Sequence, residues 1–78
     1  MTPAQCRAAR GLLDWTQAKL AEAAGLALAT VVKFERNGRY VPMGAIKALR
    51  LALEAAGAEF IPENGSGEGV RLQKGKLN

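Results

Sequence analysis

The sequence predicts a mainly α-helical fold of four helices followed by a short β-hairpin. Four stretches place apolar residues three or four positions apart, which is the spacing of one helix face, and residues typical of helix ends bound them. From Glu59 the composition changes to short β-type segments around a glycine-rich turn. With 78 residues, 49% of them hydrophobic, the chain can form one small core. We therefore expect a helical domain over 1–57, a hairpin over 58–72 and a flexible basic tail over 73–78.

The first helix is predicted to begin at Pro3 and to run to about Leu12. The Thr2 hydroxyl can accept a hydrogen bond from a first-turn N–H, proline suits the first helical position, and the Gln5 side chain can reach back to the cap. Apolar residues at positions i, i+3 and i+7 give this helix one core-facing side. These residues are Cys6, Ala9 and Leu13.

A second and a third short helix are predicted on either side of a glycine turn. Thr16 is a suitable N-cap for the second helix, and Gly25 stands where a left-handed residue ends it. The third helix covers 28–36 and ends at Asn37-Gly38. The residues predicted to face the core are Leu20, Ala21, Ala24, Val31 and Phe34.

The fourth helix is predicted between Pro42 and Gly57, where apolar residues form one broad stripe. Leu51 lies on the opposite side of this helix, where an apolar side chain would face water in a monomer. It is either part of an interface or a single exposed leucine of the ordinary kind. The stripe consists of Ala45, Ile46, Leu49, Ala52, Leu53 and Ala56.

The last part of the chain predicts a hairpin of two short strands. Phe60-Ile61 and 70–72 are β-type segments, and the intervening 62–69 is rich in turn formers. A disordered tail is the alternative, because two strands are marginally stable unless they pack on a helix or pair with another chain. Residues 73–78 are expected to be loose in either case.

Composition excludes several kinds of site. The chain has no histidine and a single cysteine, so it cannot build a Ser/His triad, a Cys/His dyad or a His/Cys zinc site. We therefore expect no enzymatic activity, no metal and no cofactor. Cys6 cannot form an internal disulfide and is expected to be a small buried hydrophobe rather than a reactive thiol. The start lacks a signal-type apolar run and no stretch reaches transmembrane length, which favours a cytoplasmic protein.

The charge is distributed by region, and the third helix lies in a basic one. The net charge is +4, and the first forty residues and the tail are basic whereas the middle is acidic. Two short helices around a glycine turn, with basic residues after the second, are typical of a helix-turn-helix. Opposite the buried side of the third helix, four residues form a narrow face that could enter a DNA major groove. They are Ala29, Val32, Lys33 and Arg36.

The segment TQAKLAEAAGLALATVVKFE, residues 16–35, resembles the XRE family of helix-turn-helix regulators, the phage-repressor and Cro class. Arg10 in the first helix also fits that pattern, and the resemblance covers roughly 5–57. It implies a four-helix lambda-repressor-like DNA-binding domain, in which 59–72 takes the place of a typical fifth helix. The matching positions are Gln17, Leu20, Ala21, Ala24, Gly25, Leu26, Thr30, Val31, Phe34 and Glu35.

The resemblance assigns roles to individual residues. It implies that Gln17 holds a phosphate and that four residues of the third helix face base edges, namely Leu28, Ala29, Val32 and Lys33. Lys33 can donate to guanine O6 or N7, whereas its three apolar neighbours can only contact thymine methyl groups. The residues that follow them are expected to reach phosphates and to make affinity depend on salt. These are Arg36, Arg39 and Tyr40.

Two further residue sets have structural interpretations. In the resembling family, the acid at the position of Glu35 pairs with the first-helix arginine, so an ion pair between Arg10 and Glu35 is expected. Trp15 precedes the second helix cap, where a hydrophobic staple would place it, although it could also stack on a base or a sugar. Ala27 stands where the family commonly has a serine or threonine N-cap.

The sequence thus predicts a sequence-specific DNA-binding regulator, a dimeric repressor that uses the third helix on double-stranded DNA. One such unit offers one recognition helix, so specific binding normally requires a two-fold dimer. Two alternatives remain, a protein-interaction module (antitoxin or anti-activator) that uses the apolar part of the same helix, and nonspecific nucleoid binding. The residues predicted to form the dimer are Leu51, Phe60, Ile61, Val70 and Leu72.

Overall fold

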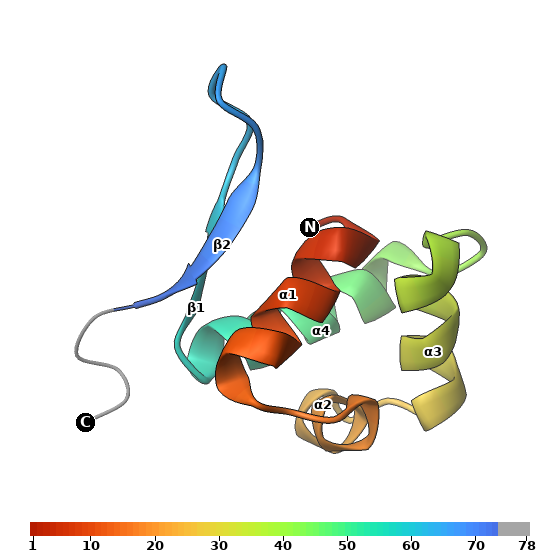
Figure 1. The fold of residues 1–78 in the computed structure, drawn as a ribbon. Helices are drawn as coiled ribbons and strands as arrows, with labels where there is room; N and C mark the ends of the chain where they lie inside the picture. Colours follow the sequence, from red (N-terminus) through yellow and green to blue (C-terminus); the bar gives the residue numbers. More distant parts are fainter. Residues whose placement is uncertain (74–78) are drawn as a thin grey trace.

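The computed structural model describes residues 1–73 and contains four helices and a two-stranded antiparallel sheet. Figure 1 shows the helices gathered in one body, with the hairpin projecting beyond α1. The predicted mainly α-helical fold with a C-terminal hairpin is confirmed. Of the predicted tail only Gln73 is described, and residues 74–78 lie outside the described part. In chain order the elements are α1 (Pro3–Leu13), α2 (Gln17–Ala24), α3 (Leu28–Asn37), α4 (Met43–Ala55), β1 (Ala58–Ile61) and β2 (Gly69–Leu72).

The start of α1 is fixed by a reciprocal pair of hydrogen bonds. The Thr2 hydroxyl accepts from the Gln5 backbone N–H at 3.1 Å, and the Gln5 side-chain oxygen accepts from the Thr2 N–H at 2.9 Å. Pro3 occupies the first helical position, as predicted. The helix ends at Leu13, one residue later than expected, because Asp14 adopts the left-handed conformation that closes it.

The ends of α2 and α3 follow the predicted cap residues. The Thr16 hydroxyl accepts from the Lys19 N–H at 3.0 Å, and Gly25 has a φ of 71°. Ala27 makes no side-chain cap to α3, and Gly38 ends that helix with a φ of 74°. The glycines permit a left-handed turn at low cost, so the chain can reverse sharply after each helix.

The core lies where the helices meet. The prediction is confirmed for the residues that are fully or nearly fully buried. The other predicted core residues are half-buried, namely Leu13, Ala24, Ala45, Ile46, Ala52 and Ala56. Leu51 lies on the outer side of α4 with 49% of its surface exposed. The buried hydrophobic residues are Cys6, Ala9, Leu20, Ala21, Val31, Phe34, Val41, Leu49, Leu53 and Ala58.

The hairpin is docked on α1 rather than left as a loose tail. Its strands pair with Phe60 opposite Val70, and both side chains pack against the core. Gln5 uses its remaining amide group to donate to the Gly69 carbonyl at 2.9 Å and the Ile61 carbonyl at 3.4 Å. One buried side chain therefore caps α1 and holds the base of the turn, which gives two strands the support they need.

We expect Gly38→Ala to destabilise the protein by about 1–3 kcal/mol, because a left-handed backbone is costly for alanine. A methyl group at Gly38 would also lie 3.3 Å from the Pro3 ring. The matched control is Gly11→Ala in α1, where a methyl group meets open space and alanine raises stability by about 0.5–1 kcal/mol. Urea unfolding of both variants measures the difference, and equal stabilities would contradict the argument.

Candidate nucleic-acid interface

The helix pair α2 and α3 is joined by a tight turn of three residues. The Leu26 N–H donates to the Ala21 carbonyl at 2.9 Å, and the Gly25 N–H donates to the Glu22 carbonyl at 3.2 Å. These bonds satisfy carbonyl groups at the end of α2 and set the direction in which α3 begins. Helix α2 packs against both α3 and α4, so contacts with α4 hold the α2–α3 pair in place (Figure 1).

Helix α3 has a buried side and an exposed side, as its spacing predicts. Val31, Phe34 and Glu35 are buried. On the opposite side, five side chains line one open depression, and they include all four predicted base-contacting residues. The structure therefore brings these four together with one further cationic side chain. The depression is lined by Leu28, Ala29, Val32, Lys33 and Arg36.

An aromatic side chain flanks this exposed side of α3. The Lys33 ammonium group lies 5.8 Å from the centre of the Tyr40 ring, within the range of a cation–π contact. Tyr40 is 86% exposed and has a φ of 59°, an unusual conformation for a bulky residue. Arg39 is exposed beside it, and its N–H donates to the Asn37 side-chain oxygen at 2.9 Å. The loop after α3 thus places a phenol ring near Lys33 and carries an exposed cation, Arg39.

Glu35 is the centre of a buried network that joins the first three helices. Arg10 donates to both carboxylate oxygens, from Nε and Nη2, at 2.7 Å each. Gln17 Nε2 donates to the same carboxylate at 3.0 Å, and the Cys6 thiol donates to it at 3.2 Å. The predicted ion pair between Arg10 and Glu35 is therefore present and has two additional donors. Gln17, the predicted phosphate contact, has its side chain oriented by this network.

The network determines the charge state of its members. Burial alone would raise the pKa of Glu35, but hydrogen bonds from Arg10, Gln17 and Cys6 outweigh it and hold that pKa below its ordinary value. Burial, with the nearby Glu35 carboxylate, raises the pKa of Cys6 to about 12. The cysteine therefore stays a neutral donor, in keeping with its prediction as a buried small hydrophobe rather than a nucleophile.

Sequence reasoning missed two of the partners of Glu35. Cys6 and Arg10 stand four residues apart on one side of α1, so the spacing placed the thiol beside the predicted ion pair. The position of Gln17 at the start of α2 gave no comparable signal, because its contact depends on how α2 is packed against α3. Arg7 adds a hydrogen bond to the Glu35 backbone carbonyl.

The remaining predicted residues lie away from this surface. Trp15 is half-buried and packs against the core, as a staple would, while the Lys19 ammonium lies 5.7 Å from its ring centre. Leu51 faces outward on α4, whereas Ile61 and Leu72 are half-buried in the hairpin. Within residues 1–73, no group of three acidic, histidine or cysteine side chains could hold a metal ion. None of the helices described is long and apolar enough to cross a membrane.

Comparison with known proteins agrees with the architecture of this surface. The sequence model of a helix-turn-helix family matches residues 7–56, which contain all of α2, α3 and α4 and most of α1. No curated protein sequence gives a match. The match covers well over half of the chain, and the matched segment holds the ion pair and the exposed side of α3. The protein is therefore a member of the XRE family of helix-turn-helix DNA-binding regulators.

Proposed function

We propose that this protein is a sequence-specific transcriptional repressor that binds double-stranded DNA as a homodimer and inserts α3 into the major groove. The observation that carries the proposal is the exposed side of α3, where the four predicted base-contacting residues line one depression together with Arg36. An α-helix fits the major groove, and base edges there distinguish all four base pairs. The opposite side of α3 is buried in the core, so the exposed side is the one available to DNA.

The chemistry of this surface predicts which residues contact base edges and which contact phosphates. Lys33 donates to guanine O6 or N7, and Leu28, Ala29 and Val32 contact thymine methyl groups. Gln17 faces the phosphate backbone from the start of α2, where a second amide hydrogen and the first-turn N–H groups are available. The other phosphate contacts are Arg36, Arg39 and Tyr40. Only one of the base-facing side chains can form hydrogen bonds, so we expect modest discrimination from direct contacts.

Dimer formation follows from the requirement for two recognition helices on half-sites about one turn of DNA apart. Leu51 is an exposed apolar residue that a second copy could cover. The side chains of Phe60, Ile61, Val70 and Leu72 are half-buried in their own chain, so the strands would contribute through unpaired backbone edges. A dimer that occupies promoter DNA excludes other proteins from it, which is the basis for proposing repression.

The test is fluorescence anisotropy of the purified protein with its own promoter DNA and with a scrambled duplex, across a salt series. We expect tighter binding to the promoter, and a log–log salt slope of about −0.9 for each phosphate contacted. Binding that is equally tight to both duplexes would leave only nonspecific nucleoid binding. Weak and equal binding to both would contradict the proposal and favour a protein partner.

A second candidate function is a protein-interaction module of the antitoxin or anti-activator kind. The observation that favours it is the apolar content of the α3 depression, since Leu28, Ala29 and Val32 carry no hydrogen-bonding group and Leu28 is 49% exposed. A protein partner could cover this apolar part while its acidic groups contact Lys33 and Arg36. The two functions differ in which substitution on α3 is the most harmful.

A further inference from the structure

A pocket lies between the first residue of the chain and the first turns of α4. It has a volume of about 350 Å³, at the lower end of the range of about 300–1,000 Å³ that is typical of small-molecule sites. It shares no residue with the depression on α3, so the proposed DNA binding makes no use of it. Its lining residues are Met1, Met43, Gly44, Ile46, Lys47 and Arg50.

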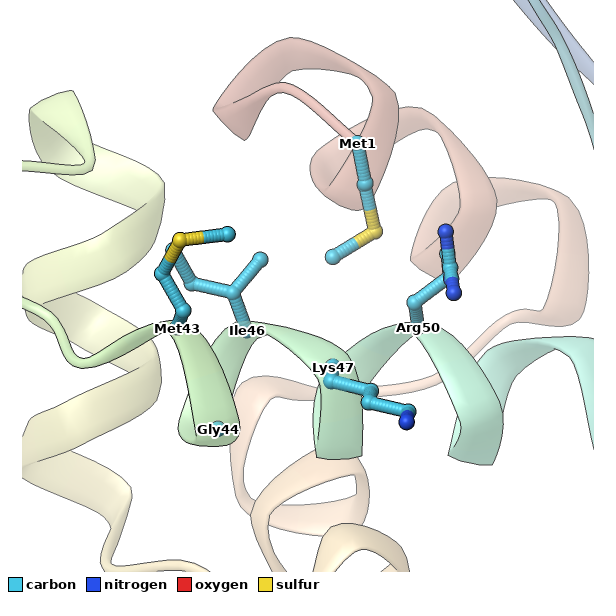
Figure 2. Close-up of a pocket in the computed structure, with 6 residues that line it drawn as sticks. All are labelled: Met1, Met43, Gly44, Ile46, Lys47 and Arg50. Carbon is cyan, nitrogen blue, oxygen red and sulfur yellow. The ribbon is translucent and has the colours of Figure 1, made fainter.

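One end of the pocket is apolar and adaptable in shape. Figure 2 shows the Met1 and Met43 side chains over Ile46 at this end. Met1 and Ile46 pack against the core, whereas Met43 is 84% exposed. A methionine side chain is flexible and polarizable, so it can fold over an apolar molecule of irregular shape. A small apolar group at this end would cover Met43 and remove apolar surface from water.

The other end of the pocket is cationic. Lys47 and Arg50 lie there (Figure 2), three positions apart on one side of α4, so two like charges are neighbours. The Arg50 Nε reaches Glu54 at 4.0 Å, and both side chains are nearly half exposed, so this pair holds the guanidinium weakly. Glu54 does not line the pocket, and Lys47 has no ion pair within residues 1–73. An anion bound beside both cations would offset their mutual repulsion.

We propose that this pocket binds a small amphipathic anion, a carboxylate that carries a short apolar chain. The carboxylate accepts hydrogen bonds from the forked donors of the Arg50 guanidinium, which match its two oxygens, and from the Lys47 ammonium group. The chain lies along α4 over Ile46 and ends at Met43. Met43 and Arg50 are about 10 Å apart along the helix axis, which suits a chain of about eight carbon atoms with bonds of about 1.5 Å. This site goes beyond the proposed DNA function and does not depend on it.

The test is an NMR titration of the full chain, labelled with ¹³C in its methionine methyl groups, with sodium octanoate. Met1 and Met43 are the two methionines of the sequence and both line the pocket, so the label reports on this site directly. We expect the methyl signals to shift and to saturate with a Kd of about 1 mM, as a ligand of about ten non-hydrogen atoms permits. Acetate has the charge without the chain, and octylamine has the chain with the opposite charge. Neither should shift the signals at concentrations at which octanoate saturates them.

Replacing both cations of the pocket, in the double variant Lys47→Gln with Arg50→Gln, should raise the Kd for octanoate at least about tenfold. The matched control is Lys19→Gln with Arg71→Gln, which also removes two exposed cations but none that lines the pocket. It should bind octanoate as the wild type does, and thermal unfolding shows that both double variants are folded. Methyl signals that octanoate does not shift, equal binding of octylamine or acetate, or an unchanged Kd in the pocket variant would each overturn the site. Promoter binding is measured separately, so either function can fail without the other.

Discussion

Reversing the charge of Lys33, Arg36 and Arg39 together is expected to abolish binding to duplex DNA. Lys33 and Arg36 line the α3 depression, and Arg39 is exposed immediately after the helix. Each lost phosphate contact removes counterion release, so reversing Arg36 and Arg39 alone should flatten the log–log salt slope by about 2. Lys33→Ala should instead reduce the preference for the best sequence by about 1–3 kcal/mol while leaving most of the nonspecific binding. Anisotropy titrations across a salt series measure both effects.

Val32→Asp separates the two candidate functions. Val32 is half-buried in the middle of the α3 depression, so an aspartate there damages an apolar protein interface most. On DNA, the same variant should be less harmful than the triple charge reversal, because phosphate contacts provide most of the affinity. Ser66→Asp in the exposed turn of the hairpin is the control, because it adds the same single negative charge away from α3. Normal DNA binding by the triple variant would contradict the DNA function and leave the protein-partner function.

The helices and their ends were predictable because their signals are local. Thr2, Thr16, Gly25 and Gly38 each act on backbone groups within a few residues, so their roles can be deduced from neighbouring positions. The exposed side of α3 was predictable for the same reason, since helical spacing alone separates it from the buried side. These features required no knowledge of how the chain folds back on itself.

The contacts that the sequence did not predict depend on how separate elements and loops are placed in the fold. Gln5 holds carbonyl groups of the hairpin 56 and 64 positions away, a role beyond its capping contact. The stacking of Lys33 on Tyr40 depends on a left-handed backbone at a tyrosine, a conformation that sequence patterns assign to glycine or asparagine. Such contacts depend on tertiary packing, which spacing within a single helix does not encode.

Replacing Arg10 with methionine is expected to lower the free energy of unfolding by about 3–5 kcal/mol, because it leaves a buried carboxylate without its cation. In the ion pair, the side chain of Glu35 is 3% exposed and that of Arg10 is 19% exposed. Methionine retains much of the aliphatic volume, so the main loss is that of the guanidinium group. Arg7→Met is the matched control, since Arg7 donates only to the Glu35 backbone carbonyl, and it should cost about 1 kcal/mol.

The dependence of stability on pH should change sign in this variant. In the wild type the pKa of Glu35 is held below its unfolded value of about 4.3, so its contribution is fully present above that pH. That contribution is lost as the pH falls through the folded pKa. Without Arg10, burial dominates and raises the pKa of Glu35, so the folded state prefers the neutral acid. The variant should therefore lose stability as the pH rises above about 4.3, toward neutrality, where the wild type retains its full contribution.

Urea unfolding of the Arg10→Met variant and the wild type at pH values above and below about 4.3 measures the difference. A variant with the wild-type pH dependence, or with a loss no larger than that of Arg7→Met, would show that the carboxylate finds other compensation in the network.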